Sequence, residues 1–350
     1  MGKKIEFIRF SFVAGVDEEL FGVKMGDDYL RDEIKKRILG IMDPGETKNI
    51  IKGNVDRLSG TSQLEIFDWV LGRSEGQPNL MKFIGECYYF GFGVASNGRE
   101  ALDWFLKSSK GGCIESMNSI GHLFRSGNME GVELDYKMAL KWYEKAGGSK
   151  NSDGWLNVGL LYQNGHGVEK DYAKAMEFYK KAAELGNSTA MYYVGNLYRK
   201  GLGVGVSAMD SIEWYTKAAE LKNAIAMNQI GVIYQNGENI VEKDVGKAKK
   251  WFQKAIEQGS IHALCNVAGI CREENRLVEA IKYYTIAYQN SEGDANVRLQ
   301  CKGSITDLIK YCGMDVLRLF VMQENKIEKL EVKINELIEE NEKLKYPEYI

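Results

Sequence analysis

Apolar and small residues recur with a period of 36 to 38 residues through the middle of this chain. The recurring phrase has the form Ile-Gly-x-x-Tyr-x-x-Gly, and its copies are centred on Gly85, Gly121, Gly159, Gly195 and Gly231. A sixth copy carries Ala268 at the glycine position and Cys271 at the aromatic position. Within each copy the apolar residues fall at helical spacing on one face. Self-similarity at this period predicts a stacked array in which each helical unit buries its apolar face against its neighbours.

A second helix is predicted after each phrase, and it begins at a capping residue. Short polar residues that cap helices stand three positions after a valine of each connecting loop, at Asn97, Asp135, Asp171, Ser207 and Asp244. Each cap is followed by an amphipathic stretch with two adjacent aromatic residues: Trp104-Phe105, Trp142-Tyr143, Phe178-Tyr179, Trp214-Tyr215 and Trp251-Phe252. Glycine is a poor helix former, so its return in five first helices indicates close approach of the second helix.

These residues resemble the Sel-1-like repeat family, which is related to the tetratricopeptide repeats. The phrases Gly165-His-Gly-Val-Glu-Lys-Asp171 and Trp142-Tyr-Glu-Lys-Ala146 match its pattern almost letter for letter, and the resemblance covers roughly residues 64 to 290. It implies an all-α fold, a right-handed α-solenoid of about six helix–turn–helix repeats that acts as an adaptor for protein complexes. We expect the array at 63–290, with repeats at about 80–115, 116–153, 154–189, 190–225, 226–262 and 263–290. The sixth copy departs from the family because it lacks the Gly-x-Gly-Val loop, and the cysteine pairs that staple helices in some relatives have no counterpart.

Both ends of the array are expected to be covered. Residues 1–62 are interpreted as an N-terminal capping region, with a small separate domain as the alternative. Within them, residues 28–42 are predicted to form a helix with its apolar side at Leu30, Ile34, Ile38 and Ile41. Residues 63–73 are interpreted as the second helix of a degenerate earlier repeat. Residues 291–314 are predicted to form a capping helix or helix pair.

A different period takes over in the tail at 315–346. Apolar residues and one asparagine alternate three and four positions apart, at Ile327, Leu330, Ile334, Leu337, Asn341 and Leu344. This heptad spacing predicts a coiled-coil helix. Ile at the a positions with Leu at the d positions favours a parallel homodimer, in which a single Asn at an a position fixes the register. Two alternatives stay open: the tail folds back on the end of the solenoid, or it pairs with a different chain.

Composition and candidate chemistry narrow the function further. A net charge of −3 and a pI near 5.9 argue against nucleic-acid binding. The sequence contains no run of about 18 apolar residues, so no integral membrane segment is predicted. Its start does not resemble a secretion signal, and a soluble intracellular protein is therefore expected. The six cysteines lack metal-ligand spacing and are expected to be reduced thiols. His122, His166 and His262 lie in different registers, so no metal, no cofactor and no catalytic constellation is predicted.

One polar register is the candidate binding site. The third position after the small residue that opens each first helix is expected to face away from the second helix. With two residues one turn further along, this register contains Ser119, His122, Asn157, Tyr193, Asn196, Gln229 and Asn266. In tetratricopeptide-like arrays this side lines a concave groove whose asparagines bind extended peptides. The alternative is that this register is simply the solvated inner surface of the solenoid and has no binding role.

The predicted function is therefore a non-catalytic scaffold or adaptor that binds an unidentified protein partner and dimerises through its tail. One alternative is a regulatory or membrane-associated subunit of a larger complex, recruited through the aromatic strip at residues 5–13. A hydrolase-like enzyme is the other alternative, since some relatives have been suspected of that activity.

Overall fold

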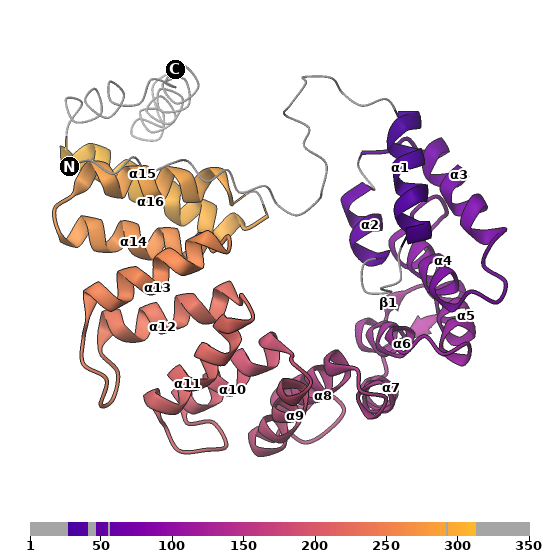
Figure 1. Ribbon diagram of the computed structural model, residues 1–350, viewed down its shortest axis with the longest axis horizontal. Helices are drawn as coiled ribbons and strands as arrows, with labels where there is room; N and C mark the ends of the chain where they lie inside the picture. The colour runs from indigo at the N-terminus through magenta and orange to yellow at the C-terminus, as the bar shows by residue number, and fades with distance from the viewer. Residues whose placement is uncertain (1–26, 41–46, 55–56, 292, 313–350) are drawn as a thin grey trace, which may run out of the picture. The chain divides into compact units, whose positions relative to one another are not determined.

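A computed structural model of the chain describes residues 27–40, 47–54, 57–291 and 293–312. This part of the chain forms sixteen helices and one short two-stranded sheet (Figure 1). The predicted all-α fold is thereby confirmed. The chain divides into two compact units, residues 1–214 and 215–350. The boundary falls within helix α11, Ala208–Glu220, and the two units are described separately.

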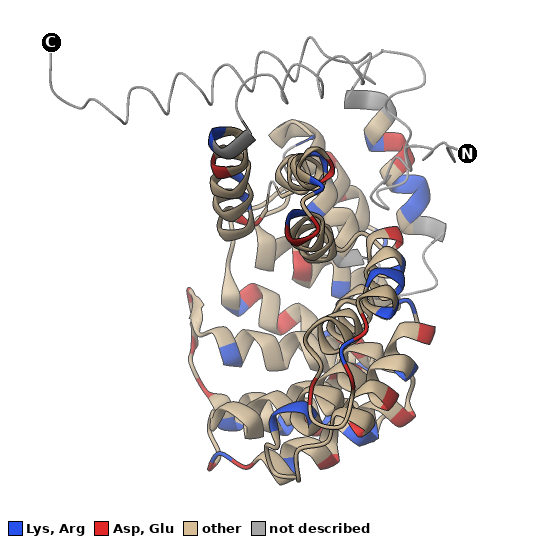
Figure 2. Cartoon of the chain, turned by 90° about the vertical axis from the view of Figure 1, so that its left-hand side faces the viewer, with Lys and Arg blue, Asp and Glu red and all other residues tan. Residues whose placement is uncertain are grey.

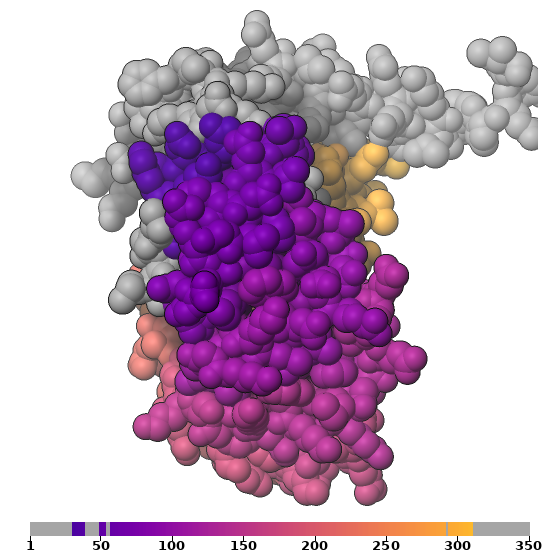
Figure 3. Space-filling model, turned by 90° about the vertical axis from the view of Figure 1, so that its right-hand side faces the viewer, coloured from indigo at the N-terminus to yellow at the C-terminus, as the bar shows by residue number. Residues whose placement is uncertain are grey.

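The repeats of the first unit are pairs of helices of 12 or 13 residues. They are α4 (Pro78–Phe90) with α5 (Gly98–Lys110), α6 (Glu115–Ser126) with α7 (Tyr136–Gly148), α8 (Ser152–Asn164) with α9 (Tyr172–Glu184), and α10 (Ser188–Lys200), which precedes α11. The two helices of each pair pack against each other and against the next pair. In the space-filling view these repeats follow one another as successive bands from indigo to magenta (Figure 3).

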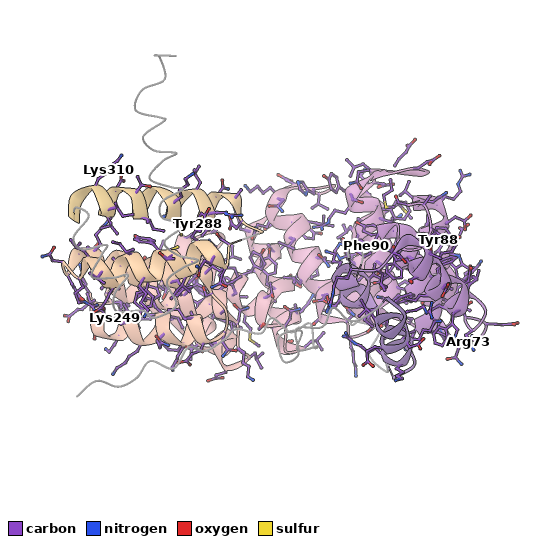
Figure 4. The ribbon with its side chains drawn as sticks, turned by 90° about the horizontal axis from the view of Figure 1, so that it is seen from above. Arg73, Tyr88, Phe90, Lys249, Tyr288 and Lys310 are labelled. Atoms are coloured by element: carbon purple, nitrogen blue, oxygen red, sulfur yellow. The ribbon has the colours of Figure 1, made fainter. Side chains whose placement is uncertain are left out.

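The repeats of the second unit continue the same design. They are α12 (Ala224–Asn236) with α13 (Val245–Glu257), and α14 (Ile261–Glu273) with α15 (Leu277–Gln289). A single longer helix, α16 (Ala295–Cys312), packs against α15 (Figures 1 and 4). This segment therefore forms one continuous helix, where the sequence analysis allowed either one capping helix or a pair. The predicted tail at 315–346 lies outside the described residues.

All five predicted caps of the second helices are confirmed. The side chains of Asp135, Asp171 and Asp244 each accept a hydrogen bond from the backbone N–H three residues on, at 2.8 to 2.9 Å. Asn97 and Ser207 cap α5 and α11 in the same way. The first helices have caps that the sequence reading missed, at Asn151, Asn187, Asn223 and Ser260. In most pairs, the start of both helices is therefore defined by a side-chain hydrogen bond from a capping residue.

The recurring glycine touches the second aromatic residue of the paired helix. A Cβ atom added to Gly121 would lie 2.5 Å from the Tyr143 ring, and one added to Gly159 would lie 2.5 Å from the Tyr179 ring. Both rings are fully buried. The contact that the sequence predicted for this glycine is confirmed, because only a residue without a side chain leaves room for the ring.

Three helices precede the clear repeats: α1 (Asp27–Gly40), α2 (Thr47–Asn54) and α3 (Gly60–Leu71). As predicted for the first of them, Leu30, Ile34 and Ile38 are buried. They belong to one apolar core with Phe67 of α3 and Phe83 of α4. Ile41 lies outside the described residues. The sequence did not predict α2, which packs against α4.

Two connecting loops are longer than the others and contain short strand pairings. In the first, β1 (Asn128–Met129) pairs antiparallel with β2 (Val132–Glu133) between α6 and α7. In the second, a single bridge joins Glu238 to Val241 between α12 and α13. Val132 and Val241 are buried beneath these turns. The added residues thus form short strand pairings, and the valine of each longer loop is buried.

Candidate partner-binding face of the first helices

The candidate site is one side of the first helices, here called the first-helix face. It is defined in each repeat by two positions: the residue two before the recurring glycine and the residue directly after it. The second helix packs on the glycine itself, so these neighbouring positions turn away from that contact. Six of the seven predicted binding residues stay partly exposed at these positions: Ser119, His122, Tyr193, Asn196, Gln229 and Asn266.

In α6 the face carries a hydroxyl and an imidazole. The Ser119 hydroxyl lies 3.4 Å from the carbonyl oxygen of Glu115, one turn earlier. His122 Nδ1 shares a hydrogen bond of 3.0 Å with the Tyr143 hydroxyl, and the two rings meet edge to face. Burial raises the pKa of Tyr143, so the phenol stays neutral at the pH where proteins work. His122 is therefore held in place by the second helix of its own repeat while one side remains open.

Asn157 of α8 differs from the other predicted residues. Its side chain is only 7% exposed. Its Nδ2 atom donates a hydrogen bond of 2.8 Å to the carbonyl oxygen of Asp153 in the same helix. An asparagine in mid-helix can satisfy its amide by bonding back to the preceding turn, and this one does. Asn157 is part of the packed helix rather than of the open surface.

In α10 the face carries a tyrosine and an amide. The Tyr193 ring stacks on the buried ring of Tyr179, with centroids 5.1 Å apart and planes 17° apart. Burial raises the pKa of Tyr193, with the neighbouring Tyr192 hydroxyl as the second cause. Asn196 follows one turn later and is also partly exposed. A flat aromatic surface therefore lies beside a group that both donates and accepts hydrogen bonds.

In the second unit the same two positions lie on α12 and α14. Gln229 is partly exposed. Asn266 Nδ2 donates a hydrogen bond of 2.8 Å to Asn228 Oδ1, which joins the first helices of two consecutive repeats. One N–H group of the Asn266 amide is therefore used in a contact within the array. Similar polar links join first helices in the first unit, where Asn118 donates to the cap residue Asn151 at 2.7 Å.

The first repeat is the exception, because its first-helix face is covered. Phe83 and Glu86 occupy the two defining positions on α4, and both are buried. Helix α2 packs on α4 and contributes Ile50 and Ile51 to the same apolar core. The Lys52 ammonium lies 5.4 Å from the centroid of Phe90, one turn beyond Glu86. Figure 4 labels Phe90 together with Tyr88, whose ring instead meets Phe67 of α3 edge to face at 5.5 Å.

The Glu86 carboxylate on this covered face is neutralised from within its own helix. It forms an ion pair with Lys82, four residues earlier, and both side chains are almost completely buried. A buried charge of this kind is tolerated only when it is paired. The Glu86 charge is thus paired at a position that is buried here and partly exposed in the later repeats.

The second helices present a different surface. The first aromatic residue of each pair is partly exposed. At Trp104, Trp142, Phe178 and Trp251 a lysine three residues later lies over the ring. The ammonium-to-centroid distances are 4.3 Å for Lys107 and Trp104, 4.8 Å for Lys145 and Trp142, and 4.3 Å for Lys254 and Trp251. Sequence reasoning missed this arrangement, although the fixed spacing of aromatic and lysine was visible. Charges of both signs are interspersed along the helices on the side shown in Figure 2.

Candidate catalytic and metal-binding groups are scattered over the described residues. No cluster of three or more His, Cys, Asp or Glu residues that could hold a metal ion occurs in that part of the chain. His166 stacks on Tyr136 with ring centroids 4.6 Å apart, whereas His262 is exposed on α14. The cysteines whose side chains the structure describes are Cys87, Cys113, Cys265, Cys271 and Cys301, and all five are free thiols.

Comparison with known proteins identifies the repeat. The family model described as Sel1 repeat matches five times, at residues 80–113, 114–148, 156–187, 188–223 and 224–260. The matches fall on the five copies that contain the recurring glycine, and the sixth copy is left unmatched. None of the curated proteins matches the chain.

Two solved structures share the fold. A Sel1 repeat protein from Oxalobacter formigenes is 26% identical with a TM-score of 0.54, over 65% of this chain and 99% of that protein. A protective antigen of uropathogenic Escherichia coli with an SLR fold is 24% identical with a TM-score of 0.53, over 78% of this chain. The chain spans 59% of the length of that antigen. Across the residues that the structure describes, every helix is too short or too polar to cross a membrane.

Proposed function

This chain is a Sel1-repeat protein, and because such proteins generally mediate protein–protein interactions, we propose that it is a non-catalytic scaffold that binds a partner protein. The binding surface is the first-helix face, and the ligand is a short segment of the partner. Within each unit, consecutive first helices present similar positions, which suits an elongated ligand.

One observation carries this proposal: in the first repeat, a helix of the chain itself occupies the first-helix face. Helix α2 lies against α4 with Ile50 and Ile51 buried and Lys52 over Phe90. All the equivalent positions in the later repeats except Asn157 are partly exposed. The surface that accepts a short helix in the first repeat is thus open further along the array, which supports a docking role for it there.

The chemistry of the open positions supports a peptide ligand. Amide and hydroxyl groups at Ser119, Asn196 and Gln229 can donate hydrogen bonds to a peptide backbone and accept them from it. Tyr193 adds an aromatic surface held rigid by its stacking on Tyr179. Rigid aromatic side chains bind with little loss of conformational entropy, which favours their use at interfaces.

The tail adds a second proposed element, a parallel coiled-coil dimer. Its seam consists of Ile327, Leu330, Ile334, Leu337, Asn341 and Leu344, which lie outside the described residues. The heptad pattern supports this pairing. Two scaffolds joined in this way would present two binding faces to one partner assembly and so raise the effective affinity.

Site-specific photocrosslinking in cells tests the binding face. A photoreactive amino acid replaces Asn196 or Gln229 on the first-helix face, and Glu144 or Lys250 on exposed parts of the second helices serves as the control. The proposal predicts that the same protein is crosslinked from both first-helix positions and from neither control position. Crosslinks that are equally strong from all four positions, or that arise from the controls alone, contradict it.

A further inference from the structure

Two cysteines of the second unit face each other across neighbouring helices. Cys265 lies on α14 and Cys301 lies on α16, and their Sγ atoms are 3.4 Å apart. Cys301 is completely buried, whereas Cys265 is partly exposed. Cys301 belongs to the apolar core of this unit, and Cys265 packs against that core. These two cysteines differ from cysteines that join the two helices of one repeat. They connect α14, the first helix of the sixth repeat, to the terminal helix α16.

The distance between the sulfurs fits a thiol–thiol contact that can be converted into a bond. A disulfide requires about 2.0 Å between the sulfurs, so the two atoms must approach by roughly 1.4 Å. Rotation of two cysteine side chains supplies a movement of this size when the helices already hold the sulfurs in contact. Cys271 is the matched contrast: its sulfur lies 3.2 Å from Arg276 Nη2 and contacts the Glu279 carboxylate rather than a second thiol.

The two sulfurs lie within hydrogen-bond distance of each other, so the titrations of the two thiols are linked. The hydrogen bond between the Cys265 and Cys301 sulfurs, in which either thiol can donate, lowers the pKa of Cys301. The same bond, followed by burial, raises the pKa of Cys265. The first proton therefore leaves the pair more readily than the second, as in other coupled sites. Cys265 is the sulfur that solvent reaches, and it becomes the nucleophile as its proton passes to the Cys301 sulfur.

We propose that Cys265 and Cys301 are a redox modification site, at which a hydroperoxide forms a reversible disulfide that staples α16 to the last repeat. The Cys265 thiolate attacks the peroxide, becomes a sulfenic acid and releases hydroxide. The Cys301 sulfur then attacks the sulfenic sulfur, forms the S–S bond and expels the oxygen as water. Two thiols and one hydrogen peroxide thus give one disulfide and two waters, and two electrons pass from sulfur to oxygen. A dithiol reductant reverses the reaction by exchange.

The disulfide would act on the least regular part of the array. The sixth repeat lacks the recurring glycine, and α16 is the helix that covers it. The two cysteines are 36 residues apart, so the bond would close a loop that contains all of α15. Closing a loop of this length restricts the unfolded chain strongly. Oxidation would hold α14, α15 and α16 together, and reduction would release that constraint.

Peptide mapping of the full-length protein tests the proposal. The reduced protein is treated with one equivalent of hydrogen peroxide, remaining thiols are blocked with N-ethylmaleimide, and peptides are analysed without reduction. We expect one linked peptide pair containing Cys265 and Cys301, which dithiothreitol removes. We also expect the apparent melting temperature to rise by about 5 °C on oxidation.

Serine variants provide the controls. Cys265→Ser and Cys301→Ser should each abolish the linked peptide and the rise in melting temperature, whereas Cys271→Ser should retain both. A sulfinic acid at Cys265 beside a free Cys301 thiol would overturn the proposal, as would a bond from either residue to Cys312. The wild-type peptide map decides the matter alone, whether or not the serine variants fold.

Discussion

Single glycines in the first helices show how closely the helices of a repeat approach. Gly231 and Gly269 both lie in first helices of the second unit. A Cβ atom on Gly231 would lie 2.5 Å from the ring of the buried Phe252, whereas a Cβ atom on Gly269 would have nothing within 4 Å. The two positions are therefore matched in helix context and opposite in surroundings.

We expect opposite effects when each glycine is replaced by alanine. Gly231→Ala should lower the free energy of unfolding by about 1 to 3 kcal/mol, because the new methyl group displaces a ring that has no room to move. Gly269→Ala should raise the free energy of unfolding by up to about 1 kcal/mol, because alanine favours the helix. Urea denaturation measures both values. Similar losses in the two variants would show that the ring contact is not what requires glycine.

A capping carboxylate links the start of one helix to pH. The backbone N–H of Lys247 donates to Asp244, and this bond is the main reason why the pKa of Asp244 is lowered in the folded protein. Because the folded pKa lies below the unfolded value of about 3.9, the stabilisation is complete above that value and is lost as the pH falls through the lower folded pKa.

The melting temperatures of the wild type and Asp244→Ala should therefore differ most at neutral pH. The gap should narrow as the pH falls below about 3.9, since protonation weakens the cap of the wild type alone. Differential scanning calorimetry between pH 7 and pH 2.5 measures it. A gap of constant size down to the lowest pH would mean that the charge of Asp244 does not contribute.

Residue types that act locally were predictable, whereas contacts between distant residues were not. The caps at Asp135 and Asp171 and the contacts of Gly121 depend on spacing within one repeat, so the sequence indicates them directly. Asn157 was assigned to an open position, but its amide bonds back to the Asp153 carbonyl. Rotamer and backbone geometry decide that bond, and a periodic pattern contains neither. The link between Cys265 and Cys301 was missed for a related reason, since it joins two helices with different sequence patterns.

At the scale of elements, the helices that repeat were predicted and the short ones were not. Helix α2 has eight residues and no copy elsewhere in the chain, so no period reveals it. The strand pair β1–β2 has two residues in each strand and was visible only as extra loop length. Both elements form because neighbouring helices bury their apolar residues, which is tertiary rather than local information.

The sixth repeat should be the first of the repeats to open. Ala268 and Cys271 replace its glycine and aromatic anchors, and its second aromatic, Tyr284, keeps 5% exposure where the equivalent Tyr143 and Tyr179 have none. Stability in such arrays depends on the interface between neighbours. Hydrogen exchange under reducing conditions should show amides of residues 263–290 exchanging before those of residues 155–235. Equal protection of the two segments would contradict this ranking.

At the scale of the whole molecule, the tail determines the proposed oligomeric state. We expect a dimer at tens of micromolar protein, and a monomer when the chain is cut after Val321. Asn341→Leu should broaden the distribution of oligomers, because the buried asparagine that fixes two-stranded pairing is lost. Light scattering coupled to gel filtration measures all three. A full-length protein that elutes as a monomer would rule out self-pairing and favour a tail that folds back or joins another chain.

The central claim is that the first-helix face binds a partner, and the affinity of the crosslinked partner for two matched triple variants tests it most directly. Ser119→Ala, Asn196→Ala and Gln229→Ala together remove three polar groups from the face. Lys141→Ala, Glu144→Ala and Lys250→Ala together remove three exposed groups from the second helices. Each lost hydrogen bond is worth about 0.5 to 1.5 kcal/mol, so the first variant should bind at least about tenfold more weakly.

Titration calorimetry with the partner gives the affinities, and thermal melts check that both variants keep a melting temperature within a few degrees of the wild type. The account predicts a tenfold or greater loss for the first-helix variant and an unchanged affinity for the control. Wild-type affinity in the first-helix variant, or an equal loss in both, would contradict it and leave the first-helix face as ordinary solvated surface.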